Sequence, residues 1–222
     1  MTSHGHRSAA IVDLSLYLVT DRSLCGPRGL ITTVRAALQG GITALQYRAK
    51  HATLREALAE ASILATMARE YGVPFIVNDR LDLALAVEAD GLHVGQSDMP
   101  VALARRLLGP DKILGLSITE QRDIDEMEAE MIDYVGLGPV FATATKTDAS
   151  SPLGLDQFRS LRAAIDLPVV AIGGIDAAQA GAVIAAGADG IAVVSAICAA
   201  DDPQAASRNL LDRIEQVRAK GA

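Results

Sequence analysis

Aromatic residues are scarce in this chain: they make up 3% of its 222 residues, and tryptophan is absent. The apolar half of the sequence is built instead from alanine, valine, isoleucine and leucine. Such residues suit parallel strands that helices cover on both faces, so the composition favours an α/β protein. We expect a single domain over residues 1–222, with residues 1–12 as an N-terminal extension.

Cysteine is also rare, and long apolar runs are missing. Cys25 and Cys198 form neither a CxxC motif nor a zinc-ligand spacing, which predicts reduced thiols. No run approaches the roughly 18 apolar residues of a membrane span, and the first residues lack the apolar core of a signal peptide. We therefore expect a cytoplasmic protein that does not associate with membranes.

Positive charge is limited as well, since the formal net charge is −7 and no basic block occurs. Nucleic-acid binding needs a strongly basic face, so this class of partner is not expected. An anionic ligand would have to be held by a few local groups. The sequence leaves open whether copies of the chain form a homo-oligomer.

Short apolar runs alternate with helical periods along the whole chain. Residues 54–71, for example, place Leu54, Ala57 and Leu58 on the helix face that also carries Ala61. Glycines in the segments 40–42, 89–91 and 187–190 are expected to end helices in a left-handed cap. Strands are predicted near residues 15–20, 44–47, 74–78, 91–94, 112–117, 134–137, 168–172 and 190–194.

Eight such strand–helix units predict a closed (β/α)8 TIM barrel. A doubly wound open sheet is the alternative, but no GxGxxG motif follows the first strand to support it. In a barrel, the chemistry lies on the loops that leave the carboxyl ends of the strands. Polar residues at those ends are therefore the candidates for a site.

The loop over residues 138–154 is the most informative of these connections. Thr143, Thr145, Lys146 and Thr147 can all donate hydrogen bonds to an oxyanion, and the lysine adds a positive charge. The loop predicts a phosphate-binding site, with a solvated surface loop as the alternative.

The exit of the second strand carries Gln46, Arg48 and Lys50 at alternating positions. Period-two spacing directs alternate side chains to one side, where two cations could clamp an anion. A solvated basic turn is the other interpretation.

Two aspartates follow the neighbouring third and fourth strands. Asp79 and Asp98 could approach one Mg²⁺ ion, which binds few carboxylates and completes its shell with water and phosphate oxygens. General acid–base catalysis and two separate helix N-caps are the alternatives.

The seventh strand ends at Gly173 and Gly174, and Ser195 follows the eighth. Glycines let the backbone N–H groups approach a phosphate, and loops after strands seven and eight commonly bind phosphate in this fold. A tight turn would explain the glycines equally well. His93 lies within the fourth strand and is interpreted as a packed core histidine.

Seven motifs in this order resemble the thiamine-phosphate synthase family, and they span nearly the whole chain. They are LYLVTD at 16–21, QYRAK at 46–50, VNDRLDLALAVEADGLHVGQSDMP at 77–100, GLS at 115–117, GPVFATATK at 138–146, VVAIGGI at 169–175 and GADGIAVVSAI at 187–197.

The resemblance implies a (β/α)8 transferase of thiamine biosynthesis that joins hydroxymethylpyrimidine diphosphate to a thiazole phosphate and releases diphosphate, with Mg²⁺ as cofactor. It implies a dissociative reaction, in which diphosphate leaves before the thiazole nitrogen attacks. Magnesium would bind Asp79 and Asp98. Catalytic roles are implied for Arg48, Lys50, Ser117 and Lys146. Substrate contacts are implied for Gln46, Arg48, Lys50, Asn78, Ser117, Thr143, Thr145, Lys146, Gly174, Val194 and Ser195.

The sequence departs from the family pattern at Ala142, usually proline, and at Ala144, often serine. A related thiazole tautomerase uses a histidine near the exit of the fifth strand, where this sequence has none. An epimerase-like barrel would need several histidine ligands at early strand ends. A non-catalytic phosphate-binding barrel is a further alternative, against which Asp79, Asp98 and Lys146 argue.

Overall fold

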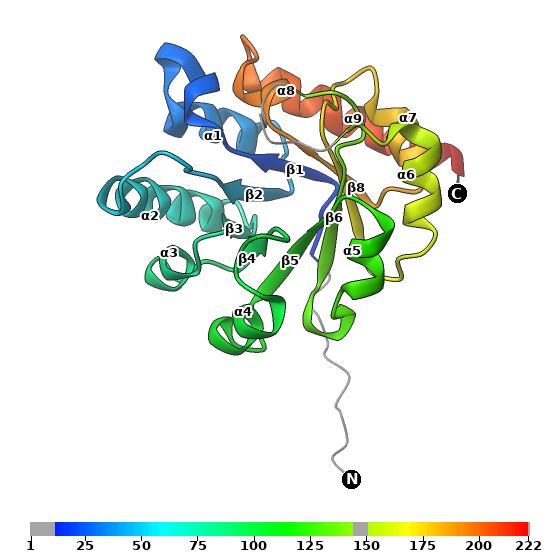
Figure 1. Ribbon diagram of the computed structural model, residues 1–222. Coiled ribbons are helices and arrows are strands. Elements are labelled where there is room, and N and C mark those ends of the chain that lie inside the picture. The colour runs from blue at the N-terminus through cyan, green and yellow to red at the C-terminus, as the bar shows by residue number, and fades with distance from the viewer. Residues whose placement is uncertain (1–11, 144–150, 222) are drawn as a thin grey trace.

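Eight parallel strands close into a barrel in the computed structural model, which describes residues 12–143 and 151–221 (Figure 1). Each strand pairs with the next in the sequence, and β8 pairs with β1. The predicted (β/α)8 barrel is confirmed, and the open sheet is excluded. The strands are β1 (Leu16–Val19), β2 (Ala44–Tyr47), β3 (Phe75–Asn78), β4 (Gly91–Val94), β5 (Ile113–Ile118), β6 (Tyr134–Leu137), β7 (Val169–Ile172) and β8 (Gly190–Val193).

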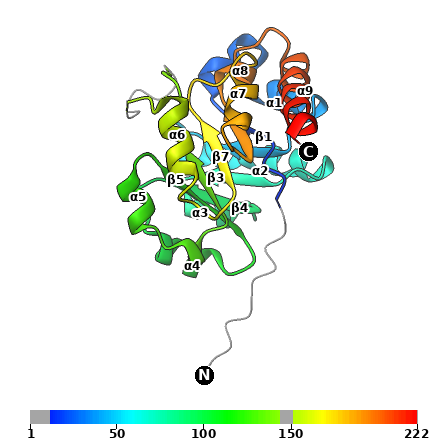
Figure 2. The same cartoon turned by 90° about the vertical axis from the view of Figure 1, so that its right-hand side faces the viewer.

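Helices surround the barrel, and the last one lies beside both α1 and α7, as Figures 1 and 2 show. No helix in the described ranges is both long and apolar enough to cross a membrane. The helices are η1 (Arg22–Arg28), α1 (Leu30–Gln39), α2 (Leu54–Glu70), α3 (Leu81–Ala86), α4 (Val101–Leu108), α5 (Gln121–Glu126), η2 (Ala129–Met131), α6 (Gly154–Arg162), α7 (Ala180–Ala185), α8 (Ser195–Cys198) and α9 (Pro203–Gly221).

Helix α2 begins at a capping box. The Thr53 hydroxyl accepts a hydrogen bond from the Glu56 N–H, and the Glu56 carboxylate accepts one from the Thr53 N–H. The expected apolar face is buried at Ala57 and Ala61, but Leu54 is 47% exposed, so its assignment to that face was wrong. Leu54 is the first residue of the helix, directly after the N-cap Thr53.

Aspartates that precede strands fix the register at the amino ends of the barrel. The Asp90 carboxylate, just before β4, accepts a hydrogen bond of 2.8 Å from the N–H of Phe75 in β3. Each contact joins a backbone N–H near the start of one strand to the aspartate that directly precedes the next strand. The same contact recurs in the pairs Asp133–Leu114 and Asp189–Val169.

The glycine caps differ from one helix to the next. Gly41 and Gly187 have positive φ angles of 94° and 101°, as predicted. Gly91 does not, because Glu88 takes the left-handed position after α3 with a φ of 53°. Gly91 begins β4 instead, where an added Cβ would lie 2.4 Å from the carbonyl oxygen of Ile113. Close strand packing therefore explains this glycine.

The two cysteines are free and buried, and their thiols lie close enough to affect one another's titration. Cys25 lies in η1 after β1, and Cys198 ends α8 after β8. Closure of the barrel brings these loops together, a contact that the spacing of the two residues in the sequence could not indicate. Of the expected N-terminal extension, residues 1–11 lie outside the described part of the chain, and Val12 packs against the barrel.

Replacing Arg105 by alanine should lower the free energy of unfolding by about 3 kcal/mol, because it removes one partner of a buried ion pair. Arg105 is 5% exposed, and its guanidinium lies 2.6 Å from the Asp133 carboxylate. It also donates to the carbonyl oxygens of Met131, Gly109 and Lys112. Chemical denaturation would measure the loss.

The neighbouring Arg106 is exposed and provides the matched control, for which we expect a change below about 0.5 kcal/mol. Equal stability of the Arg105→Ala and Arg106→Ala variants would contradict the structural role of Arg105.

Candidate active site

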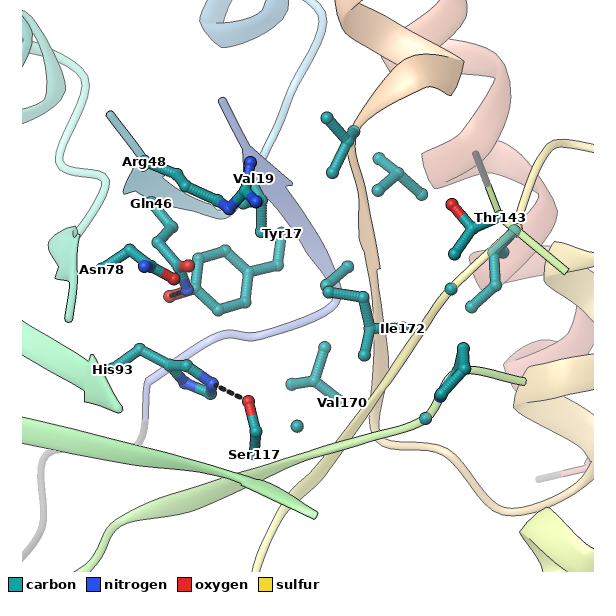
Figure 3. Close-up of a pocket in the computed structure, with 18 of the residues that line it drawn as sticks. Tyr17, Val19, Gln46, Arg48, Asn78, His93, Ser117, Thr143, Val170 and Ile172 are labelled. Atoms are coloured by element: carbon teal, nitrogen blue, oxygen red, sulfur yellow. Dashed lines mark hydrogen bonds between the residues drawn. The ribbon is translucent and has the colours of Figure 1, made fainter. Parts of the chain in front are cut away.

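A cavity of about 200 Å³ opens at the carboxyl ends of the strands, and every strand contributes to its lining (Figure 3). Parallel closure of the barrel brings these eight strand ends to one rim, as the fold predicts. Three residues predicted for the phosphate loop, Thr145, Lys146 and Thr147, lie outside the described residues, as does Ala144. The predicted site residues that line the cavity are Gln46, Arg48, Asn78, Ser117, Thr143, Gly174, Val194 and Ser195.

One side of the cavity carries amide, imidazole and hydroxyl groups together with one guanidinium. Figure 3 shows Gln46, Asn78, His93 and Ser117 on this side, with Arg48 beside Gln46, and Thr143 on the other. The Ser117 hydroxyl lies 2.9 Å from Nε2 of His93, within hydrogen-bonding distance. Amide and hydroxyl groups of this kind can orient a heteroaromatic ring through its nitrogens and amino groups.

The opposite side is formed by the loops after β6 and β7, which hydrogen-bond to each other. The N–H of Val140 donates to the Ile172 carbonyl at 2.8 Å, and the N–H of Phe141 donates to the Gly173 carbonyl at 3.0 Å. These bonds hold the β6 loop against the β7 turn, so Thr143 reaches the cavity. The hydroxyl and the turn's backbone can together contact a phosphate.

Gly174 cannot carry a side chain without moving this loop. Its φ is +61°, and an added Cβ would lie 2.4 Å from the Ala142 carbonyl oxygen and 2.9 Å from Cβ of Phe141. Both the backbone angle and the close approach therefore require glycine. The predicted phosphate turn is thus also a tight packing point between two loops.

A Gly174→Ala substitution should raise the KM for a phosphorylated substrate at least about tenfold, because it displaces the loops that line the site. Gly72→Ala is a matched control, since Gly72 also has a positive φ, +67°, but has nothing within 4 Å of an added Cβ. Steady-state kinetics of the two variants would separate displacement of the site from backbone strain. Similar KM values would argue against the phosphate turn.

The basic residues after β2 take different positions. Arg48 lines the cavity, and its Nη1 lies 3.6 Å from Oδ2 of Asp21, which is longer than a direct hydrogen bond. Lys50 is exposed and acts electrostatically on Asp79. The structure thus brings Gln46 and Arg48 together at the cavity and places Lys50 near enough to Asp79 to affect its pKa.

The two predicted metal-binding aspartates are in contact. The carboxyl groups of Asp79 and Asp98 lie close enough to interact, and Asp98 also accepts a bond of 2.7 Å from the Gly95 N–H. Burial, followed by this contact and the Asp98 charge, raises the pKa of Asp79 to about 6, against the opposing effect of Lys50. Paired carboxylates of this kind are a donor set that suits a divalent cation.

No group of three or more histidine, cysteine or acidic side chains suited to a metal occurs in residues 12–143 and 151–221. A cation at Asp79 and Asp98 would complete its shell with water or substrate oxygens. Such a shell is typical of Mg²⁺, so the residues present fit this ion.

The N-cap interpretation of the aspartates is wrong. Helix α3 is capped at Arg80 and helix α4 at Pro100, with no side-chain hydrogen bond at either position. Asp79 instead adopts a left-handed backbone with a φ of 60°, which a non-glycine residue rarely takes. Unfavourable backbone conformations of this kind are concentrated at active sites and ligand-binding sites.

Tyr17 and Tyr134 line the cavity, but neither was predicted from the sequence to be a site residue. Both tyrosines are 1% exposed. Each lies in a strand of mostly apolar residues, so the sequence pattern does not distinguish it from the leucines and valines of the core. His93 is buried, as expected of a core histidine, and it also faces the cavity. A tyrosine within a barrel strand, where its hydroxyl needs a buried partner, is the signal that could have located them.

The closed barrel, its rim cavity and the nearby aspartate pair define a (β/α)8 protein whose site suits small phosphorylated molecules. The family model for thiamine monophosphate synthase matches residues 16–197. The chain belongs to this family.

Relatives support the same assignment. A thiamine-phosphate synthase of Chloroflexus aurantiacus is 54% identical over 202 residues, covering 91% of this chain and 93% of the relative. One from Desulfitobacterium hafniense is 49% identical and covers 90% and 97%. The solved thiamine phosphate pyrophosphorylase from Pyrococcus furiosus superposes with a TM-score of 0.84 at 41% identity, covering 93% and 98%.

Proposed function

We propose that this chain forms thiamine phosphate by transferring hydroxymethylpyrimidine from its diphosphate to the nitrogen of a thiazole phosphate, with release of diphosphate. Membership of the family and the high coverage of its relatives support this reaction. The observation that carries the proposal is the layout of the cavity. Amide and hydroxyl groups lie beside Arg48 on one side, a phosphate-type turn lies opposite, and Lys50 and the paired aspartates are nearby.

Different groups of residues would contact the two substrates. Gln46, Asn78 and Ser117 would orient the pyrimidine ring. Arg48, Lys50 and Lys146 would hold the diphosphate. The thiazole phosphate would contact Thr143, Thr145, Gly174, Val194 and Ser195. Asp79 and Asp98 would hold Mg²⁺, which would supply positive charge to the diphosphate oxygens.

The chemistry requires stabilisation of the leaving group above all. Negative charge grows on the diphosphate as its bond to the pyrimidine methylene breaks, so contacts from Arg48 and Lys50 strengthen in the transition state. The described lining contains one arginine, Arg48, and no lysine or carboxylate side chain.

Formation of thiamine phosphate from both purified substrates tests the proposal, with detection as fluorescent thiochrome after oxidation. We expect product that depends on added magnesium and disappears with a chelator. An Asp79→Asn preparation, purified identically, controls for contaminating enzyme.

Absence of product from protein whose thermal unfolding shows it to be folded would contradict the proposal. Isomerisation of a thiazole carboxylate phosphate would then support the tautomerase alternative. Binding of thiazole phosphate without either reaction would support a non-catalytic barrel.

A further inference from the structure

Five side chains from five strands form one continuous hydrogen-bonded chain through the barrel interior, which we call the relay. It runs from Gln46 in β2 to Tyr17 in β1, Tyr134 in β6, His93 in β4 and Ser117 in β5. Its successive contacts are Nε2 to Oη at 2.9 Å, Oη to Oη at 2.9 Å, Oη to Nδ1 at 2.8 Å, and Nε2 to Oγ at 2.9 Å. Figure 3 shows the last of these as a dashed line.

Two strand glycines make room for the relay. A Cβ on Gly115 would lie 2.2 Å from Cζ of Tyr134 and 2.5 Å from Nδ1 of His93. A Cβ on Gly136 would lie 3.2 Å from Cε1 of His93. Glycine within a strand weakens the strand unless another group needs the space, and here the relay occupies it.

The donors and acceptors along the relay follow from its first member. Nε2 of Gln46 can only donate, so Tyr17 accepts from it and gives its own hydrogen to Tyr134. Tyr134 then donates to Nδ1 of His93, which leaves Nε2 of His93 protonated and donating to Ser117. The hydrogen of the Ser117 hydroxyl is thereby left for the cavity.

Burial supports this order. It raises the pKa of Tyr17 and Tyr134 well above the usual value, so both phenols keep the single hydrogen that each donates. The opposite tautomer of His93 would leave one phenolic hydrogen without an acceptor in an interior where both tyrosines are 1% exposed. An unsatisfied buried donor is costly, and the described residues contain no buried side-chain nitrogen or oxygen without a partner.

We propose that Tyr17, Tyr134 and His93 are positioning residues that hold Ser117 as a hydrogen-bond donor toward a ring nitrogen of the pyrimidine substrate. The proposal rests on the proposed function and extends it. Ring nitrogens of an aminopyrimidine accept hydrogen bonds, so a donor fixed in advance recognises this ring without reordering buried hydrogens. The two tyrosines would act through His93 and Ser117 rather than on the diphosphate.

The tautomer of His93 is the first test, and it requires no substrate. In ¹⁵N-histidine-labelled full-length protein, we expect a protonated Nε2 and an unprotonated Nδ1 for His93, assigned by comparison with His93→Gln. Tyr134→Phe should shift the signals toward a mixture of tautomers, because it removes the donor to Nδ1. A protonated Nδ1 in the unsubstituted protein would overturn the relay order, even if Tyr134→Phe fails to fold.

A double-mutant cycle is the second test. Tyr134→Phe should lower kcat/KM about tenfold in the unsubstituted chain, as expected for one lost buried hydrogen bond. In a Ser117→Ala background the same change should cost less than about twofold, because the group through which it acts is gone.

Tyr47→Phe is the matched control. Tyr47 is also 1% exposed, but its hydroxyl donates to Glu60 outside the relay, so we expect kcat/KM within about twofold of the unsubstituted protein. Equal effects of Tyr134→Phe in both backgrounds would overturn the proposal. Failure to form thiamine phosphate would instead contradict the proposed function, while the tautomer would still decide the relay order.

Discussion

Replacing Asp79 by asparagine should lower turnover by at least about 100-fold and yet stabilise the protein without metal. The turnover falls because a neutral amide beside Asp98 would be a poorer ligand for the divalent cation proposed to stabilise the leaving group. The stability rises because asparagine places no charge in this partly buried position and cannot repel the Asp98 carboxylate. Loss of activity with gain of stability is typical of residues held for function.

The stability effect has a defined pH dependence. The pKa of Asp79 rises from 3.8 to about 6 on folding, so between these values the folded state binds more protons than the unfolded state. Stability of the metal-free protein therefore falls as pH rises through this window. Asp79 is partly exposed, so solvent screening limits the gain from Asp79→Asn at pH 7.5 to about 1 kcal/mol.

Turnover and metal-free melting temperature at pH 5 and pH 7.5 would check both effects, with the larger melting difference expected at pH 7.5. Asp156→Asn is the control, because this side chain is fully exposed on α6 and pairs only with Arg159 in the described structure. An Asp79→Asn enzyme that keeps a tenth of its turnover, or that melts below the unsubstituted protein at pH 7.5, would contradict the assignment.

Removing the charge of Arg48 should also cause a large loss of activity. Arg48→Ala should lower kcat/KM for the pyrimidine diphosphate by about 100-fold, because no other ionic side chain of the described lining can replace it. Its side chain is 14% exposed, and the distance to Asp21 leaves its hydrogen-bonding capacity for a substrate. Steady-state kinetics with varied pyrimidine diphosphate would measure the loss.

Arg48→Lys should recover part of that activity, since it restores the charge without the planar fork of donors. Arg122→Ala is the surface control, because Arg122 is exposed and pairs with Glu126 one turn along α5. An unchanged kcat/KM in Arg48→Ala would remove this residue from the diphosphate site.

Several features could be predicted from local sequence. The alternation of apolar runs and helical periods located all eight strands, because strand and helix impose different spacings on buried residues. Chain order then implied the barrel, and the barrel implied a rim to which residues such as Gln46 and Ser117 converge. These inferences depend on periodicity and chain order, both of which can be determined directly from the amino-acid sequence.

Contacts between distant strands were decided only by the tertiary structure. Burial of Tyr17 and Tyr134 against His93 depends on which inward-facing side chains share a layer, and strand register sets that layer. Likewise, the pairing of Asp79 with Asp98 and of Cys25 with Cys198 arises from loop paths that no local pattern encodes. A hydrogen bond, or the pKa shift that it causes, depends on which residues are neighbours in space. Most candidate site residues could therefore be predicted from the sequence, whereas their environments were decided by the fold.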